Sequence, residues 1–167
     1  MTPVRVTEAG RERLDDLKPL WRDLHEHHAA LAPPQALVRP FSESWRRQRQ
    51  RYEHLFASQG AFLLLAAGGD GVPVGYALAH VGPGLSIWQT TDAVVTVETL
   101  SVAARLRGRG VGAMLLARVQ DEARRRHGAE VWLSALSTND GAVRFYERQG
   151  YVPFSVELRR VPGSPDG

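Results

Sequence analysis

The sequence predicts an α/β domain, and three observations support that prediction. The chain has 167 residues, which suits one domain, and 43% of them are apolar, as in soluble globular folds. Its second half reads as strand, helix, strand, helix and strand, which predicts parallel strands joined by a right-handed crossover. Its first half contains a hairpin signal, and a hairpin pairs its strands antiparallel. A mixed sheet is therefore expected.

The first part of the chain is predicted to form a strand and two helices. Alternation over Val4–Thr7 indicates the strand. Pro19 lies within the helical pattern that follows, so that helix is either kinked there or starts again with Pro19 in its first turn. Ser42 is expected to cap a second helix that runs to about Ser58. The periodic positions of the first helix are Leu14, Leu17, Trp21, Leu24 and His28.

The middle of the chain is rich in β-strand signals. Ala61–Ala67 and Val74–Val81 are apolar runs separated by Gly-Gly-Asp-Gly, which predicts a hairpin. Asp92–Val102 is a long β-branched run and is expected to be the central strand. A helix follows the glycines after this strand and is expected to end near Arg124–Arg126, with Gly128 as its C-cap.

The end of the chain is predicted to contain a strand, a short helix and a last strand. The strand is Glu130–Leu136, and the helix is Gly141–Gln149. Tyr151–Val161 is expected to form one strand, or else the last strands are very short. Residues 1–161 are assigned to the domain and 162–167 to a disordered tail. So short an ending leaves a sheet edge that a second chain would cover, and a homodimer is therefore expected.

Composition argues against several classes of function. Lys and Arg number 21 against 18 Asp and Glu, a net charge of +3 that gives no argument for a nucleic-acid partner but suits a small polyanionic ligand. The absence of cysteine excludes disulfides and thiolate metal sites, and the histidines at 25–28 have no evident third ligand, so no metal is expected. No apolar run reaches the ~18 residues of a membrane span, and no signal peptide is recognisable. A cytoplasmic protein without a membrane partner is expected.

Three alternate glycines stand between the central strand and its helix. The segment reads Arg107, Gly108, Arg109, Gly110, Val111 and Gly112. A helix N-terminus presents unpaired N–H groups and a positive dipole end, and glycines let an anion approach the backbone closely. Arg107 and Arg109 add positive charge and forked donors. The pattern predicts a cradle for a phosphate or pyrophosphate.

Two known phosphate motifs fit this stretch poorly. A P-loop requires Lys after its last glycine, and none follows Gly112. Gly108, Gly110 and Ala113 satisfy the permissive form of the dinucleotide fingerprint. That fingerprint places an acidic residue at the end of the next strand, whereas Glu130 stands at the start of its strand. A dinucleotide-binding domain stays open as a rival interpretation.

Two motifs resemble those of the GNAT N-acetyltransferase superfamily. Arg107-x-x-Gly110-x-Gly112 is similar to its Q/R-x-x-G-x-G/A motif. Asn139–Tyr151 (NDGAVRFYERQGY) resembles the family's later helix, and the two motifs occur in the family's order. The resemblance implies a single-domain GNAT fold, which is a mixed, twisted sheet with helices on both faces. It also implies a V-shaped splay between the central parallel strands.

The resemblance further implies acetyl-CoA as the cosubstrate. The backbone N–H groups of Arg107–Gly112 would hold its pyrophosphate. Asn139 would contact the cofactor from the next loop, and Tyr146 would lie near the thioester sulfur. The backbone groups that would pair with the pantetheine arm, like an added strand, belong to Leu100, Ser101 and Val102.

The implied reaction is direct transfer of the acetyl group to a primary amine. An ammonium cannot attack a thioester, so a base must remove its proton, and Glu98 is the candidate. Strand alternation places Glu98 on the same face as Leu100 and Val102, unless a bulge intervenes. Tyr146 would donate a proton to the departing thiolate, and a backbone N–H of the central strand would polarise the carbonyl.

Each of these roles has a structural alternative. Glu98 could be an ion-pair partner, Tyr146 a core aromatic residue and Asn139 only a helix cap. The same fold could also hold an acyl-CoA as a sensor or scaffold without turnover. The acceptor, a small-molecule amine or a peptide, is not identified by any motif. On position alone, the residues expected to line its entrance are His25, His28, Trp45, Tyr52 and Trp88.

Overall fold

The chain folds into one layer of strands with helices packed on it. The computed structural model describes residues 3–33, 36–84, 86–89, 91–126 and 130–160. The strands are β1 (Arg5–Ala9), β2 (Phe62–Ala67), β3 (Pro73–Pro83), β4 (Ala93–Val102) and β5 (Glu130–Leu133). The helices are η1 (Arg11–Leu17) and η2 (Ala104–Leu106), which are 3₁₀, and α1 (Lys18–Leu31), α2 (Phe41–Ser58), α3 (Val111–Arg126) and α4 (Asp140–Arg148). Among these helices none is long and apolar enough to cross a membrane.

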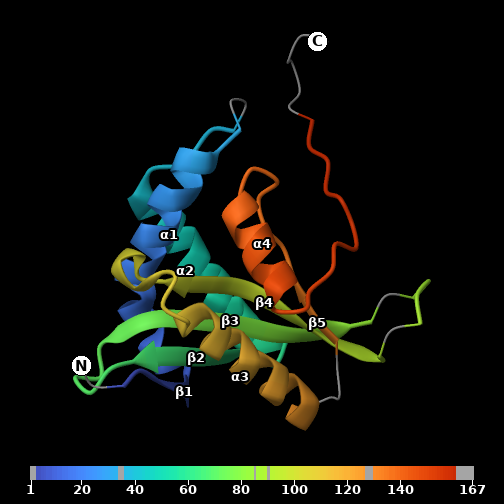
Figure 1. Ribbon diagram of the computed structural model, residues 1–167, viewed down its shortest axis with the longest axis horizontal. Helices are drawn as coiled ribbons and strands as arrows, with labels where there is room; N and C mark the ends of the chain where they lie inside the picture. Colours follow the sequence, from blue (N-terminus) through green and yellow to red (C-terminus); the bar gives the residue numbers. More distant parts are fainter. Residues whose placement is uncertain (1–2, 34–35, 85, 90, 127–129, 161–167) are drawn as a thin grey trace.

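The sheet is mixed, as predicted. Its order is β1-β2-β3-β4-β5, with antiparallel pairing up to β4 and parallel pairing between β4 and β5. The hairpin of β2 and β3 and the parallel neighbours on either side of α3 are therefore confirmed. α1 and α2 cover one face of the sheet, and α3 covers the other (Figure 1).

Prolines set the starts of the first two helices. η1 ends at Leu17 and α1 begins at Lys18, so the helix restarts with Pro19 in its first turn, where no backbone N–H is needed. The predicted cap at Ser42 is wrong. Pro40 holds the N-cap position of α2 with ψ of 144°, which leaves Ser42 inside the helix. The predicted C-cap Gly128 and the predicted tail, 162–167, lie outside the described residues.

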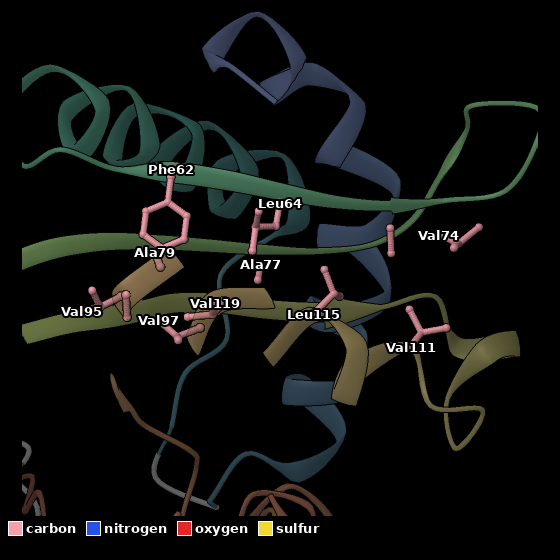
Figure 2. Packing of buried hydrophobic residues seen from close by; sticks show 12 residues of the cluster. Phe62, Leu64, Val74, Ala77, Ala79, Val95, Val97, Val111, Leu115 and Val119 are labelled. Atoms are coloured by element: carbon pink, nitrogen blue, oxygen red, sulfur yellow. The ribbon is translucent and has the colours of Figure 1, made fainter. Parts of the chain in front are cut away.

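The larger part of the core lies between the sheet and α3. Val95 and Val97 of β4 pack in one cluster with Leu115 and Val119 of α3, and all four are buried (Figure 2). Gly75 of β3 makes room for this contact, because a Cβ there would lie 3.3 Å from a methyl carbon of Leu115. α3 is therefore held close to the strand that it follows.

The opposite face of the sheet packs against η1, α1 and α2. The hydroxyl of Tyr52 donates to Thr99 Oγ1 at 2.7 Å and lies 3.0 Å from the hydroxyl of Tyr76. Burial raises the pKa of Tyr52 to about 12, so this network is neutral. Trp45 is also buried, with 7% of its surface exposed. The prediction that Tyr52 and Trp45 line the acceptor entrance is wrong, because the apolar face of α2 packs on the sheet.

β4 is paired on both sides over only part of its length. Its partners in β5 run from Glu130, opposite Val94, to Leu133, opposite Val97. β5 ends there, earlier than the predicted Leu136. On the β3 side, pairing continues to Val102. The second half of β4 therefore has one edge without a neighbouring strand in the described chain.

The predicted last strand, Tyr151–Val161, is wrong. Residues 151–160 form neither helix nor strand, and Val161 lies outside the described residues. Pro153 cannot donate to a ladder, and the segment runs away from the sheet (Figure 1). β5 is therefore the edge strand of the described sheet.

Candidate active site

The predicted cradle is a turn of left-handed residues ahead of α3. Gly108 and Gly110 have φ of +73° and +84°, a region that favours glycine. A Cβ at either position would meet nothing within 4 Å. Gly112 differs, because a Cβ there would lie 3.1 Å from Phe145 Cζ of α4. Two glycines therefore shape the loop and keep its outer side open, and the third lets α4 pack against the start of α3.

This loop presents unpaired backbone donors. The first bond of α3 joins the Met114 N–H to the Gly110 carbonyl at 3.0 Å. Arg107 and Arg109 donate their backbone N–H groups within turns, so they do not contribute free donors. Unpaired N–H groups at the positive end of a helix suit an anion. Within residues 107–113, the N–H groups without an acceptor in the described structure are those of Gly108, Gly110, Val111, Gly112 and Ala113.

The side chain of Arg107 anchors the loop. Its Nε donates to the carbonyl of Val102 and its Nη2 to the carbonyl of Asp23, each at 3.2 Å. The carboxylate of Asp23 accepts the Ala104 N–H at 2.9 Å. Arg109 is exposed. α1 therefore helps to hold the loop in place, and the exposed guanidinium of Arg107 is engaged by two backbone carbonyls.

The unpaired edge of β4 leads to this loop. The N–H of Ala103 donates to Val74 of β3 at 2.9 Å, so Ala103 and Ser101 direct their peptide groups toward β3. Leu100 and Val102 therefore direct theirs toward the open edge. The hydroxyl of Ser101 donates to the Leu20 carbonyl at 3.0 Å in the core. Of the three predicted backbone contacts, Leu100 and Val102 face the open edge.

Asn139 caps α4, as one of its two predicted roles requires. Its Oδ1 accepts the Ala142 N–H at 3.1 Å, and its Nδ2 lies 3.5 Å from His27 Nε2 of α1. Thr138 beside it donates to the Leu31 carbonyl at 2.6 Å. The loop before α4 is therefore joined to the end of α1.

Glu98 occupies a β-bulge, and this corrects its predicted orientation. Leu78 pairs with Thr99 while Ala79 pairs with Val97, so Glu98 is the extra residue between them. The bulge shifts the alternation by one residue. Leu100 packs with the core on the α3 face, whereas the carboxylate of Glu98 meets Arg51 of α2 on the other face. The prediction that these two residues share a face is wrong.

Glu98 lies in a cluster of three charged or titratable groups. Arg51 bonds both of its carboxylate oxygens, with Nη2 to Oε2 at 2.8 Å. His80 Nε2 lies 3.8 Å from the same oxygen, and both side chains are largely buried. Burial lowers the pKa of His80, Arg51 adds to the shift and Glu98 opposes it. His80 Nδ1 is buried and takes no partner in the described chain.

Tyr146 lies on the other side of the central strands, in α4. Its ring centroid is 6.1 Å from that of Tyr151, and burial raises its pKa to about 12. It lines a cavity of about 640 Å³ between β5, α4 and residues 151–157. No contact in the described structure joins Tyr146 to Glu98. The two predicted catalytic residues thus stand in separate environments.

The remaining acceptor candidates lie in different places. His25 Nε2 is 2.9 Å from the Arg39 carbonyl. Burial lowers the pKa of His28, and nearby His27 adds to that shift. Trp88 is 55% exposed and packs on Phe154, away from the histidines. The histidine beside Asn139 is His27, at 3.5 Å from its Nδ2, and His27 was not among the predicted candidates.

Sequence reasoning missed Arg51, His80 and Asp23. Arg51 and Glu98 are 47 residues apart, and no local pattern reveals such a pair. His80 gave a usable signal, because it is the single histidine in the run Val74–Val81, whose other residues are apolar apart from Tyr76. Among the described residues, no group of three His, Asp or Glu could hold a metal ion.

A family model and a curated relative match this chain. The model of the acetyltransferase (GNAT) family matches residues 21–151. Streptothricin acetyltransferase from Streptomyces lavendulae is 32% identical over 88 residues, which are 53% of this chain and 43% of that protein. The match thus spans less than half of the relative's length.

Solved structures share the fold. A GCN5-related N-acetyltransferase from Ralstonia eutropha JMP134 has a TM-score of 0.75 over 96% of this chain and 100% of its own, at 18% identity. The aminoglycoside N-acetyltransferase AAC(6')-Iy, solved in complex with CoA, has a TM-score of 0.71 over 97% of each chain, at 18% identity. The family model covers most of this chain, and the motifs, sheet and cradle agree with it. The chain belongs to the GNAT acetyltransferase family.

Proposed function

We propose that this protein is an acetyl-CoA-dependent N-acetyltransferase that moves an acetyl group directly to a primary amine. The observation that carries the proposal is the position of unpaired N–H groups at the start of α3, next to the unpaired edge of β4. The first suits a pyrophosphate, and the second suits an extended arm with amide groups. Acetyl-CoA has both parts, and its thioester supplies the activated acetyl group.

The backbone provides most of the proposed cosubstrate site. Open space outside Gly108 and Gly110 fits the close approach of a phosphate. Leu100 and Val102 would bond the amide groups of the arm, and Asn139, whose Nδ2 lies 3.5 Å from His27 Nε2, would contact the cofactor from the loop before α4. The pyrophosphate donors would be the N–H groups of Gly108, Gly110, Val111 and Gly112.

Glu98 is the proposed base. Its carboxylate is bonded by Arg51, so the acceptor's ammonium would take the place of the guanidinium before giving up its proton. The neutral imidazole of His80, 3.8 Å from Glu98 Oε2, would stabilise the protonated carboxyl by accepting a hydrogen bond from it. Arg51 and His80 are therefore positioning residues for Glu98.

Tyr146 is the proposed acid. Burial raises its pKa to about 12, so its hydroxyl is protonated at neutral pH. A protonated phenol can donate to a departing thiolate. Much of the rate would come from holding the amine and the thioester in line.

A small-molecule amine is the proposed acceptor class. One relative is named for streptothricin and one structural neighbour for aminoglycosides. Glu98 in a partly buried site suits a cationic amine, because a carboxylate there favours a positive partner. We also propose that the protein is cytoplasmic, because acetyl-CoA is available there.

The cradle is tested by calorimetric titration with acetyl-CoA, with NADH in parallel. Gly110→Ala places a Cβ in the open space where the phosphate would approach. Gly71→Ala is the matched control, because Gly71 has φ of +72° and equally open surroundings in the distant β2–β3 turn. We expect acetyl-CoA binding that weakens at least about tenfold in Gly110→Ala only. Binding of NADH alone would support a dinucleotide-binding domain instead.

Turnover separates an enzyme from a sensor. The assay is CoA thiol release with a panel of polyamines, amino acids, aminoglycosides and peptides. We expect release with at least one small amine, and loss of release in Tyr146→Phe with acetyl-CoA binding retained. Binding without release for every amine would favour a non-catalytic acyl-CoA module.

A further inference from the structure

An ion pair joins α2 to the bulge of β4. Arg51 bonds both carboxylate oxygens of Glu98, with Nη2 at 2.8 Å from Oε2. The side chain of Glu98 is 14% exposed, whereas that of Arg51 is 52% exposed. The carboxylate is thus largely buried and the guanidinium is half open to solvent. A dissolved molecule can reach Arg51 without any change in the fold.

The two charges of this pair balance each other. His80 Nε2 lies 3.8 Å from Glu98 Oε2, but burial lowers the pKa of His80, so the imidazole is neutral at neutral pH. Arg49 of the same helix differs, because it pairs with two carboxylates on the surface. In the described chain, Arg51 and Glu98 have only each other as a partner of opposite charge.

An acceptor amine would disturb this balance. In the proposed reaction, its ammonium takes the place of the guanidinium at Glu98. Arg51 would then have no anion and would stand next to a second positive charge, which is unfavourable in a partly buried site. A carboxylate on the acceptor would restore the missing partner. Its two oxygens match the planar fork of the guanidinium, as those of Glu98 do.

We propose that the acceptor is an amino acid, whose ammonium binds Glu98 while its carboxylate binds Arg51. This inference rests on the proposed function and narrows its acceptor class. One ion pair is exchanged for two, so the total charge of the site does not change. Because the guanidinium and the carboxylate touch in the free protein, an α- or β-amino acid, whose own two charges are close together, can contact both. Arg51 then determines specificity, in addition to positioning Glu98.

The first test compares each common amino acid with its amide in the CoA-release assay. The amide keeps the amine and the side chain and replaces only the carboxylate. It also makes the amine less basic, so more of the amine is unprotonated and intrinsic reactivity favours the amide. We expect kcat/KM to be at least about tenfold higher for the acid of the best pair, because the amide loses a hydrogen bond between charged groups.

Variants of α2 assign this preference to Arg51. The readout is the acid-to-amide ratio of kcat/KM within each variant, which the folded fraction does not change. Arg51→Gln should bring the two substrates within about threefold of each other. Arg51→Lys keeps the charge but not the fork, so it should retain part of the preference. Arg49→Gln, the matched control in the same helix, should keep the ratio of the parent.

Calorimetry with the same acids and amides, in the presence of CoA, gives a readout that needs no turnover. An acid that binds at least about tenfold more tightly than its amide, and loses this advantage in Arg51→Gln, supports the inference even without CoA release. That combination would contradict the proposed enzyme instead. Amides that bind and react as well as the acids would overturn the inference and leave the acetyltransferase intact. A preference for acids that survives Arg51→Gln, or no binding of any amino acid, would also overturn it.

Discussion

The two halves of β4 have the same kind of sequence but different surroundings. Residues 93–97 have β3 on one side and β5 on the other, and Val95 and Val97 are buried beneath α3. Residues 98–102 have β3 alone, and the bulge at Glu98 begins them. A strand paired on both sides has used its backbone groups, whereas a strand paired on one side can still bind a ligand through them. The first half is therefore the frame, and the second half carries the site that we propose.

Glu98→Gln should give the largest effect on the second half. The amide cannot accept the proton of the acceptor, and loss of a positioned base costs about 10²- to 10⁴-fold in kcat. The measurement is CoA release under saturating amine, together with the melting temperature.

The matched control for this substitution is Glu53→Gln, in the same helix as Arg51. Glu53 is half exposed and pairs with Arg49, so its loss should change turnover little. If Glu98→Gln retained turnover within a few-fold of the parent, Glu98 would be only an ion-pair partner of Arg51.

Val95→Ala, in the first half of β4, should lower stability without changing turnover, which is the reverse of the effect of Glu98→Gln. Val95 is fully buried, and removing its two methyl groups should lower the free energy of unfolding by about 2 kcal/mol, or roughly thirtyfold in the unfolding equilibrium. Turnover per folded molecule should not change. Urea unfolding measures the first quantity and CoA release the second.

Val72→Ala is the control for this stability change, because Val72 is 56% exposed. Its cost should stay within about 0.5 kcal/mol. If Val95→Ala and Val72→Ala lowered the free energy of unfolding equally, the first half of β4 would not be the structural frame of the sheet.

Much of the frame could be predicted from the sequence, and the site only in part. The hairpin and the parallel neighbours follow from local runs of apolar residues, and the cradle follows from glycines at positions that need positive φ. The local pattern of residues does not reveal the position of the bulge. One extra residue then reverses the face of every later side chain, so the predicted orientation of Glu98 failed. The partners of Glu98 lie 47 and 18 positions away in the chain, on α2 and β3. Only the fold brings them together.

Asp23→Ala should loosen the loop that joins the second half of β4 to α3. It removes the acceptor of the Ala104 N–H, so the segment before α3 loses one of its two bonds to α1 and keeps the bond from Arg107 to the backbone carbonyl of residue 23. We expect acetyl-CoA to bind about fivefold more weakly, the value of one hydrogen bond of about 1 kcal/mol. Calorimetry measures this change. Asp16→Ala, which removes an exposed ion pair with Arg13, is the control and should leave the affinity unchanged. Unchanged affinity in Asp23→Ala would show that the loop is held by its own turns.

The smallest expected effect concerns His80, which lies where the two halves meet. Burial lowers its pKa in the folded state below the ordinary value of 6.5, so the unfolded chain binds its proton more readily. The contribution of His80 to stability is therefore fully present above pH 6.5 and declines as the pH falls through its lowered pKa. The melting temperature of the parent should fall more than that of His80→Gln between pH 7.5 and 5.5. His54→Gln, on the exposed surface of α2, should follow the parent. Parallel curves for the parent and His80→Gln would mean that the imidazole can be protonated beside Glu98 at no cost, and the neutral hydrogen-bond acceptor proposed for the site would then be lost.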